Sequence, residues 1–120
     1  MPFAVLVNGG TASGAEILAG APHDAGRAVV VGEKTLGTGT VLNEFRLRDG
    51  SALMLAVREW LTPRGHTIWH KGIEPDVKVA LGAGVDPVFP ETLAHLSAAQ
   101  QRATKDAQLL KALSLLLSSA

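Results

Sequence analysis

Two short apolar runs in the first third of the chain predict strands of a parallel sheet. Residues 3–7 are uninterrupted hydrophobic positions between Pro2 and the polar, glycine-rich segment 8–10, and residues 29–31 are three valines in a row. Continuous apolar runs of this length are typical of strands buried on both faces, whereas a strand with one wet face alternates apolar and polar residues. We therefore expect two parallel, buried strands at these positions.

A helical period separates the two runs. Three apolar residues between them fall on one side of a helix: Ile17, Leu18 and Ala21. We expect this helix to begin near Ser13 and to end around Gly26. Pro22 removes a backbone donor from the last turns, so an earlier end is the alternative. A strand, a helix and a second strand in this order predict a βαβ unit.

The next part of the chain has two apolar-rich segments joined by a tight turn. Residues 41–47 and 52–60 are rich in strand-forming residues, and Asp49-Gly50 between them is a strong turn signal. This pattern predicts a β-hairpin. Further short extended stretches are expected at 67–69 and 77–81.

The composition shifts at a glycine-rich step, residues 82–84, and the leucines that follow recur at helical spacing. These residues are Leu93, Leu96, Leu109, Leu110, Leu113 and Leu117. We expect a helical tail, with the polar stretch 100–106 as a linker between two helices. The domain prediction is therefore one α/β unit over residues 1–82 and a helical tail over 83–120 that is not an independent domain.

Composition narrows the functional classes. Hydrophobic residues make up 47% and charged residues 18% of the 120 positions, which is typical of one packed globular core. Eleven basic residues balance eleven acidic ones without forming a cluster, which argues against a nucleic-acid partner. With no cysteine and no recognisable ligand motif, we expect neither a cofactor nor a metal site. No apolar stretch reaches the roughly 20 residues of a transmembrane helix, and the first residues lack the pattern of a secretory signal.

Five separated motifs between residues 3 and 80 occur in an order and spacing that resemble one protein family. They are Val7-Asn8-Gly9-Gly10-Thr11-Ala12-Ser13-Gly14-Ala15-Glu16-Ile17, Gly32-Glu33-Lys34-Thr35-Leu36-Gly37-Thr38-Gly39, Asp49-Gly50-Ser51-Ala52-Leu53, Thr62-Pro63-Arg64-Gly65 and Lys71-Gly72-Ile73-Glu74-Pro75-Asp76. Together they resemble the carboxyl-terminal part of the catalytic domain of the carboxyl-terminal processing proteases, serine peptidases of the S41 type. The resemblance implies an α/β fold, a crotonase/ClpP-like ββα-type peptidase core with a β-hairpin and a helical tail.

Ser13 occupies the place of the family's nucleophile in the first motif. A serine just beyond a glycine-rich turn, at the start of a helix, exposes its hydroxyl, and the nearby amides of Gly14 and Ala15 are candidate donors to an oxyanion. The structural alternative is that Ser13 is an ordinary N-cap. Glu16, three residues further on, fits a capping box better than a catalytic carboxylate.

The second motif departs from the family at the residues that activate the serine. The family has a lysine base at the position of Thr38 and a glutamine that orients it at the position of Leu42. Threonine is no base at neutral pH and leucine has no hydrogen-bonding group, so the usual base and its supporting residue are both replaced. Lys34 is a substitute base only if burial lowers its pKa far below the free value of about 10.4.

The resemblance implies a serine-type endopeptidase that acts on protein or peptide substrates. The alternative is a catalytically inactive, protease-like module for binding or oligomerisation, with the helical tail as a surface for a second copy. In the family, a PDZ domain and the rest of the catalytic core normally precede this region, and neither is found among these 120 residues. Family members are usually extracytoplasmic, but this sequence leaves the compartment open.

Overall fold

The computed structural model describes residues 3–118 and contains a small parallel sheet, a projecting hairpin and four helices within that range. Pro2, expected to bound the first strand, lies outside the described residues. The elements, in chain order, are β1 (Ala4–Val7), α1 (Gly14–Asp24), β2 (Val29–Gly32), β3 (Thr40–Arg46), β4 (Ala52–Glu59), β5 (Val77–Lys78), α2 (Pro90–Leu93), α3 (Ala98–Arg102) and α4 (Ala107–Ser118).

The predicted βαβ unit is confirmed. β1 and β2 pair in parallel with Val5 opposite Val30, and β5 joins β2 in parallel, which gives the order β1-β2-β5. The expectation that the first strand is buried on both faces was wrong, because Leu6 in β1 is 38% exposed. β1 lies at the edge of the sheet, so the elements that cover the central strand leave it partly open.

Helices cover both faces of the central strand. Val30 packs with residues of α1 and the later loops in one buried cluster, whose members are Val7, Ala19, Val30, Ile68 and Ile73. Side chains alternate along a strand, so Val31 points to the other face. There α4 packs against β1 and β2, with Leu109 and Ala112 buried. The sheet is thus the centre of a three-layer body.

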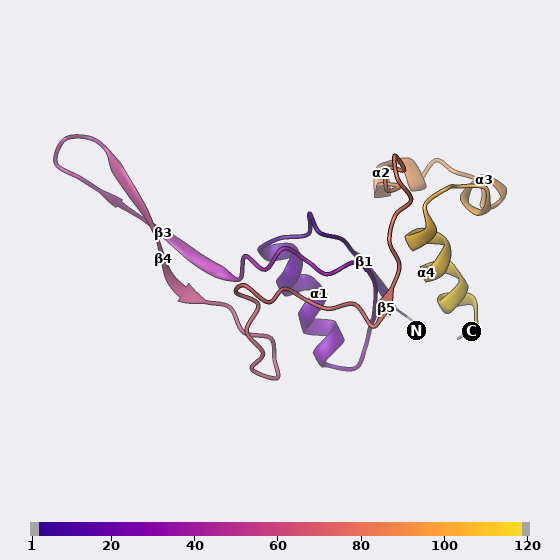
Figure 1. Cartoon of the computed structure of the whole chain (residues 1–120), viewed down its shortest axis with the longest axis horizontal. Coiled ribbons are helices and arrows are strands. Elements are labelled where there is room, and N and C mark those ends of the chain that lie inside the picture. The colour runs from indigo at the N-terminus through magenta and orange to yellow at the C-terminus, as the bar shows by residue number, and fades with distance from the viewer. Residues whose placement is uncertain (1–2, 119–120) are drawn as a thin grey trace.

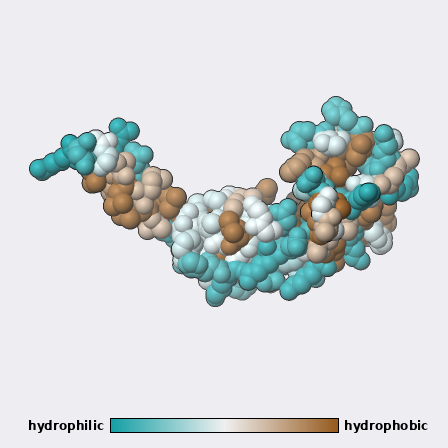
Figure 2. Space-filling view, turned by 45° about the horizontal axis from the view of Figure 1, so that its top comes forward, coloured by the Kyte–Doolittle hydropathy of each residue, from teal (hydrophilic) through white to brown (hydrophobic). Residues whose placement is uncertain are grey.

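The predicted hairpin is also confirmed, but it stands away from the body. β3 and β4 pair antiparallel with Phe45 opposite Leu53, and the ladder shifts register between Val41 and Leu42. Every residue of β4 is exposed. Figure 1 shows the two strands as a long arm at one end of a molecule that measures 59 × 31 × 24 Å. In Figure 2 hydrophobic residues cover much of this arm behind a hydrophilic tip.

Three sequence-based boundaries need correction. α3 covers residues 98–102 and so takes in the first three residues of the expected linker 100–106, because Gln100 completes a capping box with Ser97 and starts a helix. The stretch 67–69 is not a strand and contributes only an isolated bridge between Thr67 and Leu61. Of the expected extended stretch 77–81, only Val77–Lys78 forms a strand. The end of α1 at Asp24, two residues beyond Pro22, is close to the expected end around Gly26. Within the described range, no helix is both long and apolar enough to cross a membrane.

Candidate active site

Ser13 sits at the turn between β1 and α1 in a strained backbone conformation. Its φ of 52° and ψ of −120° lie in a region that favours glycine, and the residue is exposed. Such a conformation costs on the order of 1–3 kcal/mol and is found mainly at functional sites. A serine on a sharp strand-to-helix turn is also the arrangement that presents the nucleophile in α/β-hydrolases.

The Ser13 hydroxyl is not used to cap the helix. Ser13 and Glu16 are placed as a capping-box pair, and the Ser13 amide donates to the Glu16 carboxylate at 2.9 Å, as the sequence predicted. The Glu16 amide, however, donates to the main-chain oxygen of Ser13 at 2.9 Å, and the Ser13 side chain makes no capping hydrogen bond. Within residues 3–118, the first turn of the helix is therefore closed by the main chain of Ser13 and not by its hydroxyl.

Glu16 is the centre of the local hydrogen-bond network. It is fully buried, and its carboxylate accepts five hydrogen bonds. Oε1 accepts from the Thr35 hydroxyl at 2.5 Å and from the Gly37 amide at 2.7 Å. Oε2 accepts from the amides of Ser13 and Thr38, each at 2.9 Å, and from the Thr38 hydroxyl at 3.3 Å. One buried carboxylate thus ties the serine turn to the loop after β2.

Burial by itself would raise the pKa of Glu16, because a carboxylate loses its hydration. The hydrogen bonds from Thr35, Thr38, Gly37 and Ser13 outweigh that effect and hold the pKa below its usual value. Glu16 is therefore ionised at neutral pH, and it acts as an anchor of fixed charge.

The loop that carries these donors needs glycine at position 37. Gly37 has a φ of 86°, and a Cβ there would lie 3.0 Å from the Gly72 amide nitrogen and 3.3 Å from the carbonyl oxygen of Ile68. The loop is further held by Thr35, which is buried and whose hydroxyl accepts from the Ile73 amide at 2.7 Å. This packing aims the Gly37 amide at Glu16.

Thr38 is brought directly against Ser13. The Ser13 amide donates to the Thr38 hydroxyl oxygen at 2.9 Å, across 25 positions of sequence. The residue at the expected position of the base therefore lies beside the candidate nucleophile. The Thr38 hydroxyl, however, accepts from the Ser13 amide and donates to the Glu16 carboxylate. A hydroxyl is also too weak a base to take the serine proton at neutral pH.

Two further positions belong to the same motif, namely Lys34, the possible substitute base, and Leu42, which stands in the place of the family's glutamine. Lys34 is half exposed and pairs with Glu74 at 3.2 Å, and Lys78 pairs with the same carboxylate at 3.1 Å. Hydrogen bonds from Lys78 and Lys34 lower the pKa of Glu74. Leu42 is on β3 and is 56% exposed. Neither Lys34 nor Leu42 has a hydrogen bond or ion pair with Ser13 among residues 3–118.

The two candidate oxyanion donors differ in their availability. The Ala15 amide donates to the Ala12 carbonyl at 3.1 Å, so it is already used in the first turn of the helix. Gly14 is exposed, and its amide has no hydrogen bond within the described part of the chain. Of the two, the Gly14 amide is the one without a hydrogen bond among the described residues.

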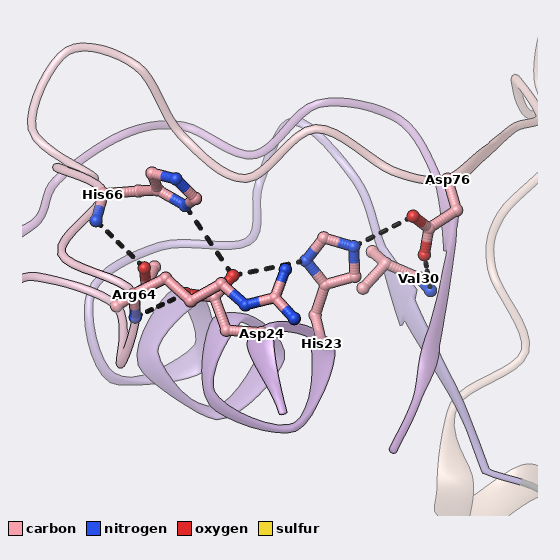
Figure 3. A network of polar contacts seen from close by, with 7 residues as sticks. His23, Asp24, Val30, Arg64, His66 and Asp76 are labelled. Atoms are coloured by element: carbon pink, nitrogen blue, oxygen red, sulfur yellow. Dashed lines mark hydrogen bonds and ion pairs between the residues drawn. The ribbon is translucent and has the colours of Figure 1, made fainter. Parts of the chain in front are cut away.

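A second polar network lies at the opposite end of α1. His23 Nε2 is 2.9 Å from an Asp76 oxygen, and the other Asp76 oxygen accepts from the Val30 amide at 2.8 Å. Figure 3 shows the His23 ring between Asp76 and the buried Asp24, which also faces His66. This network fastens the helix to β2 and to later loops, and it has no contact with Ser13 within the described residues.

Sequence reasoning placed Ser13 and Thr38 but missed how Glu16 joins them. Glu16 was expected only to cap its own helix, and Thr35 was not singled out at all. No local pattern connects a carboxylate in the first turn of a helix with hydroxyls 19 and 22 positions away. The available signal was indirect, namely two threonines three residues apart in a glycine-rich loop after a buried strand.

The α/β fold and the Ser13 turn together point to a class of proteins. An exposed serine on a strained strand-to-helix turn of an α/β protein resembles the arrangement by which α/β-hydrolases present their nucleophile. The chain belongs to peptidase family S41, because the model of that family matches residues 1–79.

Curated relatives agree with this assignment. The chain is 51% identical over 81 residues to "Carboxyl-terminal-processing peptidase 3, chloroplastic" of Arabidopsis thaliana. The matched residues are 68% of this chain and 16% of that protein. It is 49% identical over 80 residues to "Carboxy-terminal processing protease CtpA" of Bacillus subtilis. These residues are 67% of this chain and 17% of that protein. The chain therefore spans about a sixth of the length of these relatives.

Solved structures have the same fold. A photosystem II D1 C-terminal processing protease superposes with a TM-score of 0.67 at 38% identity, over 87% of this chain and 26% of that one. A putative S41 protease from Bacteroides fragilis superposes with a TM-score of 0.64 at 16% identity, over 98% of this chain and 28% of that one. The mixed α/β architecture is thus that of S41 proteases.

Proposed function

We propose that this chain carries the nucleophile of a serine-type, carboxyl-terminal processing peptidase, with Ser13 as the attacking residue. The observation that supports this most is the strained φ of Ser13 together with a hydroxyl that makes no capping bond. In the proposed reaction, Ser13 Oγ bonds to the scissile carbonyl carbon while a water molecule takes its proton and passes it to the scissile nitrogen. The C–N bond then breaks and the amine leaves with that proton. A second water attacks the acyl carbon, its proton returns to Ser13 Oγ, and the carboxylic acid is released.

The proposal assigns the neighbouring groups by their positions. The Gly14 amide, and the Ala15 amide if its helical bond opens, would stabilise the oxyanion. Glu16 keeps the turn in its strained form but does not touch the substrate. Thr38 occupies the place of the family's lysine and Leu42 that of its glutamine, so the proton acceptor is missing from the usual position. Lys34 is the substitute base that this chain offers, and its pairing with Glu74 opposes that role.

The main alternative is a protease-like module that binds or oligomerises without catalysis. The bond between the Thr38 hydroxyl and the Ser13 amide favours it, because it fills the place of the base with a group that cannot accept the serine proton. The helical tail would then serve as the surface for a second copy. Under either function, protein or peptide segments are the expected ligands.

Three structural details belong to the same proposal. The body would be a crotonase/ClpP-like ββα-type core over residues 1–82, and residues 83–120 would be a tail that depends on it. The burial of Leu109 and Ala112 in α4 supports that dependence, since an amphipathic helix is stabilised mainly by its packing. In the proposed oligomer, Leu117, which is 75% exposed near the end of α4, would lie in the contact between the two tails.

A fluorophosphonate probe tests the central claim, because it phosphonylates a serine that is activated as a nucleophile. We expect mass to be added at Ser13 and to be absent in Ser13→Ala. Ser51→Ala is the matched control, since Ser51 is an exposed serine in the hairpin turn. No labelling from neutral to alkaline pH would favour the binding module.

A restored base extends the same test. Thr38→Lys with Leu42→Gln should raise the labelling rate when the chain is preceded by the rest of an S41 catalytic domain, because a desolvated lysine would then face Ser13. Thr40→Lys with Leu42→Gln keeps the glutamine but places the lysine two residues out of position, and it should leave the rate low. Equal rates for the two pairs would show that Thr38 does not occupy the base position.

A further inference from the structure

The turn between β1 and α1 begins with an asparagine that is followed by two glycines, Asn8-Gly9-Gly10. Both main-chain groups of Asn8 are held, because its amide donates to the Thr11 hydroxyl at 3.0 Å and its carbonyl accepts from the Thr11 amide at 2.9 Å. The side-chain oxygen Oδ1 of Asn8 accepts from the Gly10 amide at 2.9 Å. The Asn8 side chain is therefore folded back over the peptide bond of Gly9.

This arrangement prepares Asn8 Cγ for attack by a main-chain nitrogen. The bond from the Gly10 amide closes a loop of atoms that contains both Asn8 Cγ and the Gly9 nitrogen. When a nucleophile adds to Cγ, negative charge develops on Oδ1, which is the atom that the Gly10 amide already faces. An amide in that position stabilises an oxyanion without having to reorient. Bond formation between the Gly9 nitrogen and Asn8 Cγ closes a succinimide ring.

The Gly9 nitrogen is available as the nucleophile. Its N–H makes no hydrogen bond among residues 3–118, in contrast to the amides on either side of it. Gly9 is exposed, and a Cβ placed on it would meet no atom within 4 Å. Glycine also has the widest choice of main-chain dihedral angles, and it has no side chain to obstruct ring closure.

We propose that Asn8 is a modification site at which the chain deamidates itself. The Gly9 nitrogen gives its proton to water and bonds to Asn8 Cγ. The Cγ–Nδ2 bond breaks, and the nitrogen takes a proton from water and leaves as ammonia. A second water then opens the succinimide. Cleavage of the new N–Cγ bond leaves aspartate, whereas cleavage of the original peptide bond leaves isoaspartate. This inference stands apart from the proposed function.

Asn43, the other asparagine in the sequence, is a natural comparison. It is exposed as well, but it lies in β3 opposite Leu55 and is followed by Glu44. The strand keeps the main chain extended, and the Glu44 side chain stands where Gly9 has only a hydrogen atom. Exposure alone would therefore select both asparagines, whereas the turn selects Asn8.

Either product changes the turn that leads to Ser13. Aspartate carries a charge where the amide was neutral. Isoaspartate adds a methylene group to the main chain between β1 and α1, and it turns the carbonyl that holds the Thr11 amide into a free carboxylate. We expect the isoaspartate form to lose fluorophosphonate labelling at Ser13, a consequence that rests on the proposed function.

Storage of the folded chain in mildly alkaline buffer at physiological temperature, followed by peptide mass spectrometry, tests the proposal. We expect the peptide that contains Asn8 to gain one mass unit, because NH₂ is replaced by OH. The peptide that contains Asn43 should keep its mass over the same period. The product has one more negative charge than the unaltered chain, whose formal net charge is zero, so ion exchange separates the two.

Two variants separate the turn from the local sequence. Gly9→Val should abolish the mass gain at Asn8, because a β-branched side chain crowds the attacking nitrogen, and the space around Gly9 accommodates it. Glu44→Gly gives Asn43 the same following residue as Asn8 but leaves it in β3. In that variant Asn43 should deamidate roughly 10-fold or more slowly than Asn8, since it lacks an amide that faces its side-chain oxygen. In urea the two rates should become similar.

The outcomes are distinct. A mass gain at Asn8 that appears only in urea would overturn the proposal, because the fold would then protect this residue. Equal rates at Asn8 and Asn43 in the folded Glu44→Gly variant would also overturn it. Deamidation of Asn8 in a chain whose Ser13 is never labelled would support this inference and reject the nucleophile. Labelling of Ser13 without any mass gain at Asn8 would do the reverse.

Discussion

Glu16→Gln is the sharpest test of how the Ser13 turn is held. The substitution keeps the size of the side chain but replaces one carboxylate oxygen by an NH₂ group and removes the charge. If the NH₂ takes the place of Oε2, it meets the amides of Ser13 and Thr38, which lie 2.9 Å away. If it takes the place of Oε1, it meets the Gly37 amide at 2.7 Å. Either orientation sets donors against donors.

The expected loss of stability follows from these bonds. A hydrogen bond to a charged group contributes about 1.5–3 kcal/mol, and Glu16→Gln loses one or two that come from main-chain amides. We therefore expect the free energy of unfolding to fall by about 3 kcal/mol. For a chain of this size each kcal/mol corresponds to about 4 °C, so the melting temperature should fall by about 12 °C.

Thermal and urea unfolding, followed by circular dichroism, measure this loss. Glu91→Gln, at an exposed position in the first turn of α2, is the matched control and should change stability by less than about 0.5 kcal/mol. The reasoning would be refuted if the two variants unfolded alike at neutral pH.

The pH dependence supplies a second check on Glu16. Its pKa in the folded chain is lowered from the usual 4.5, so its ionised form contributes stability that is fully present above that pH. The contribution is lost as pH falls below 4.5 and through the folded pKa. The stability difference between the unaltered chain and Glu16→Gln should therefore be constant near neutral pH and shrink in acid.

Two further changes probe the serine and the substitute base. Ser13→Gly should raise the free energy of unfolding by about 1 kcal/mol, because glycine adopts a φ of 52° without the penalty of a Cβ. Urea titrations measure this change. A fall in stability would instead show that Ser13 acts as an N-cap. Lys34→Ala should cost less than about 1 kcal/mol, since its pair with Glu74 is exposed, and should not alter the fluorophosphonate labelling rate at Ser13. Abolished labelling would identify Lys34 as the base.

The local parts of the fold were predictable from the sequence. The βαβ unit and the hairpin follow from apolar runs, a helical period and one turn signal, each of which lies within a dozen residues. The exposure of Leu6 was not predictable in this way, because a hydrophobic run does not say whether its strand becomes central or lies at an edge. The start of α3 was missed because the composition of residues 100–106 was given more weight than the Ser97 cap.

The site was predictable only in part, for a similar reason. Resemblance placed Ser13 and Thr38 in sequence, but their approach depends on Glu16, which gathers donors from a loop about twenty residues away. A sequence shows that a glutamate will be buried only if the groups that donate hydrogen bonds to its carboxylate can be identified. Those groups include main-chain amides, which carry no signature in the amino-acid sequence.

The Glu16 network also bears on the order in which the chain folds. Its bonds join residues at most 22 positions apart, and the bond from the Ser13 amide to Thr38 spans 25, whereas the bond that ties Asp76 to β2 spans 46. Closing a shorter loop costs less chain entropy, and local contacts speed folding. We therefore expect the Ser13 turn and its bonds to Glu16 to form early, before β5 joins the sheet. During synthesis, the chain would then hold Ser13 in its strained conformation before the rest of the domain has folded.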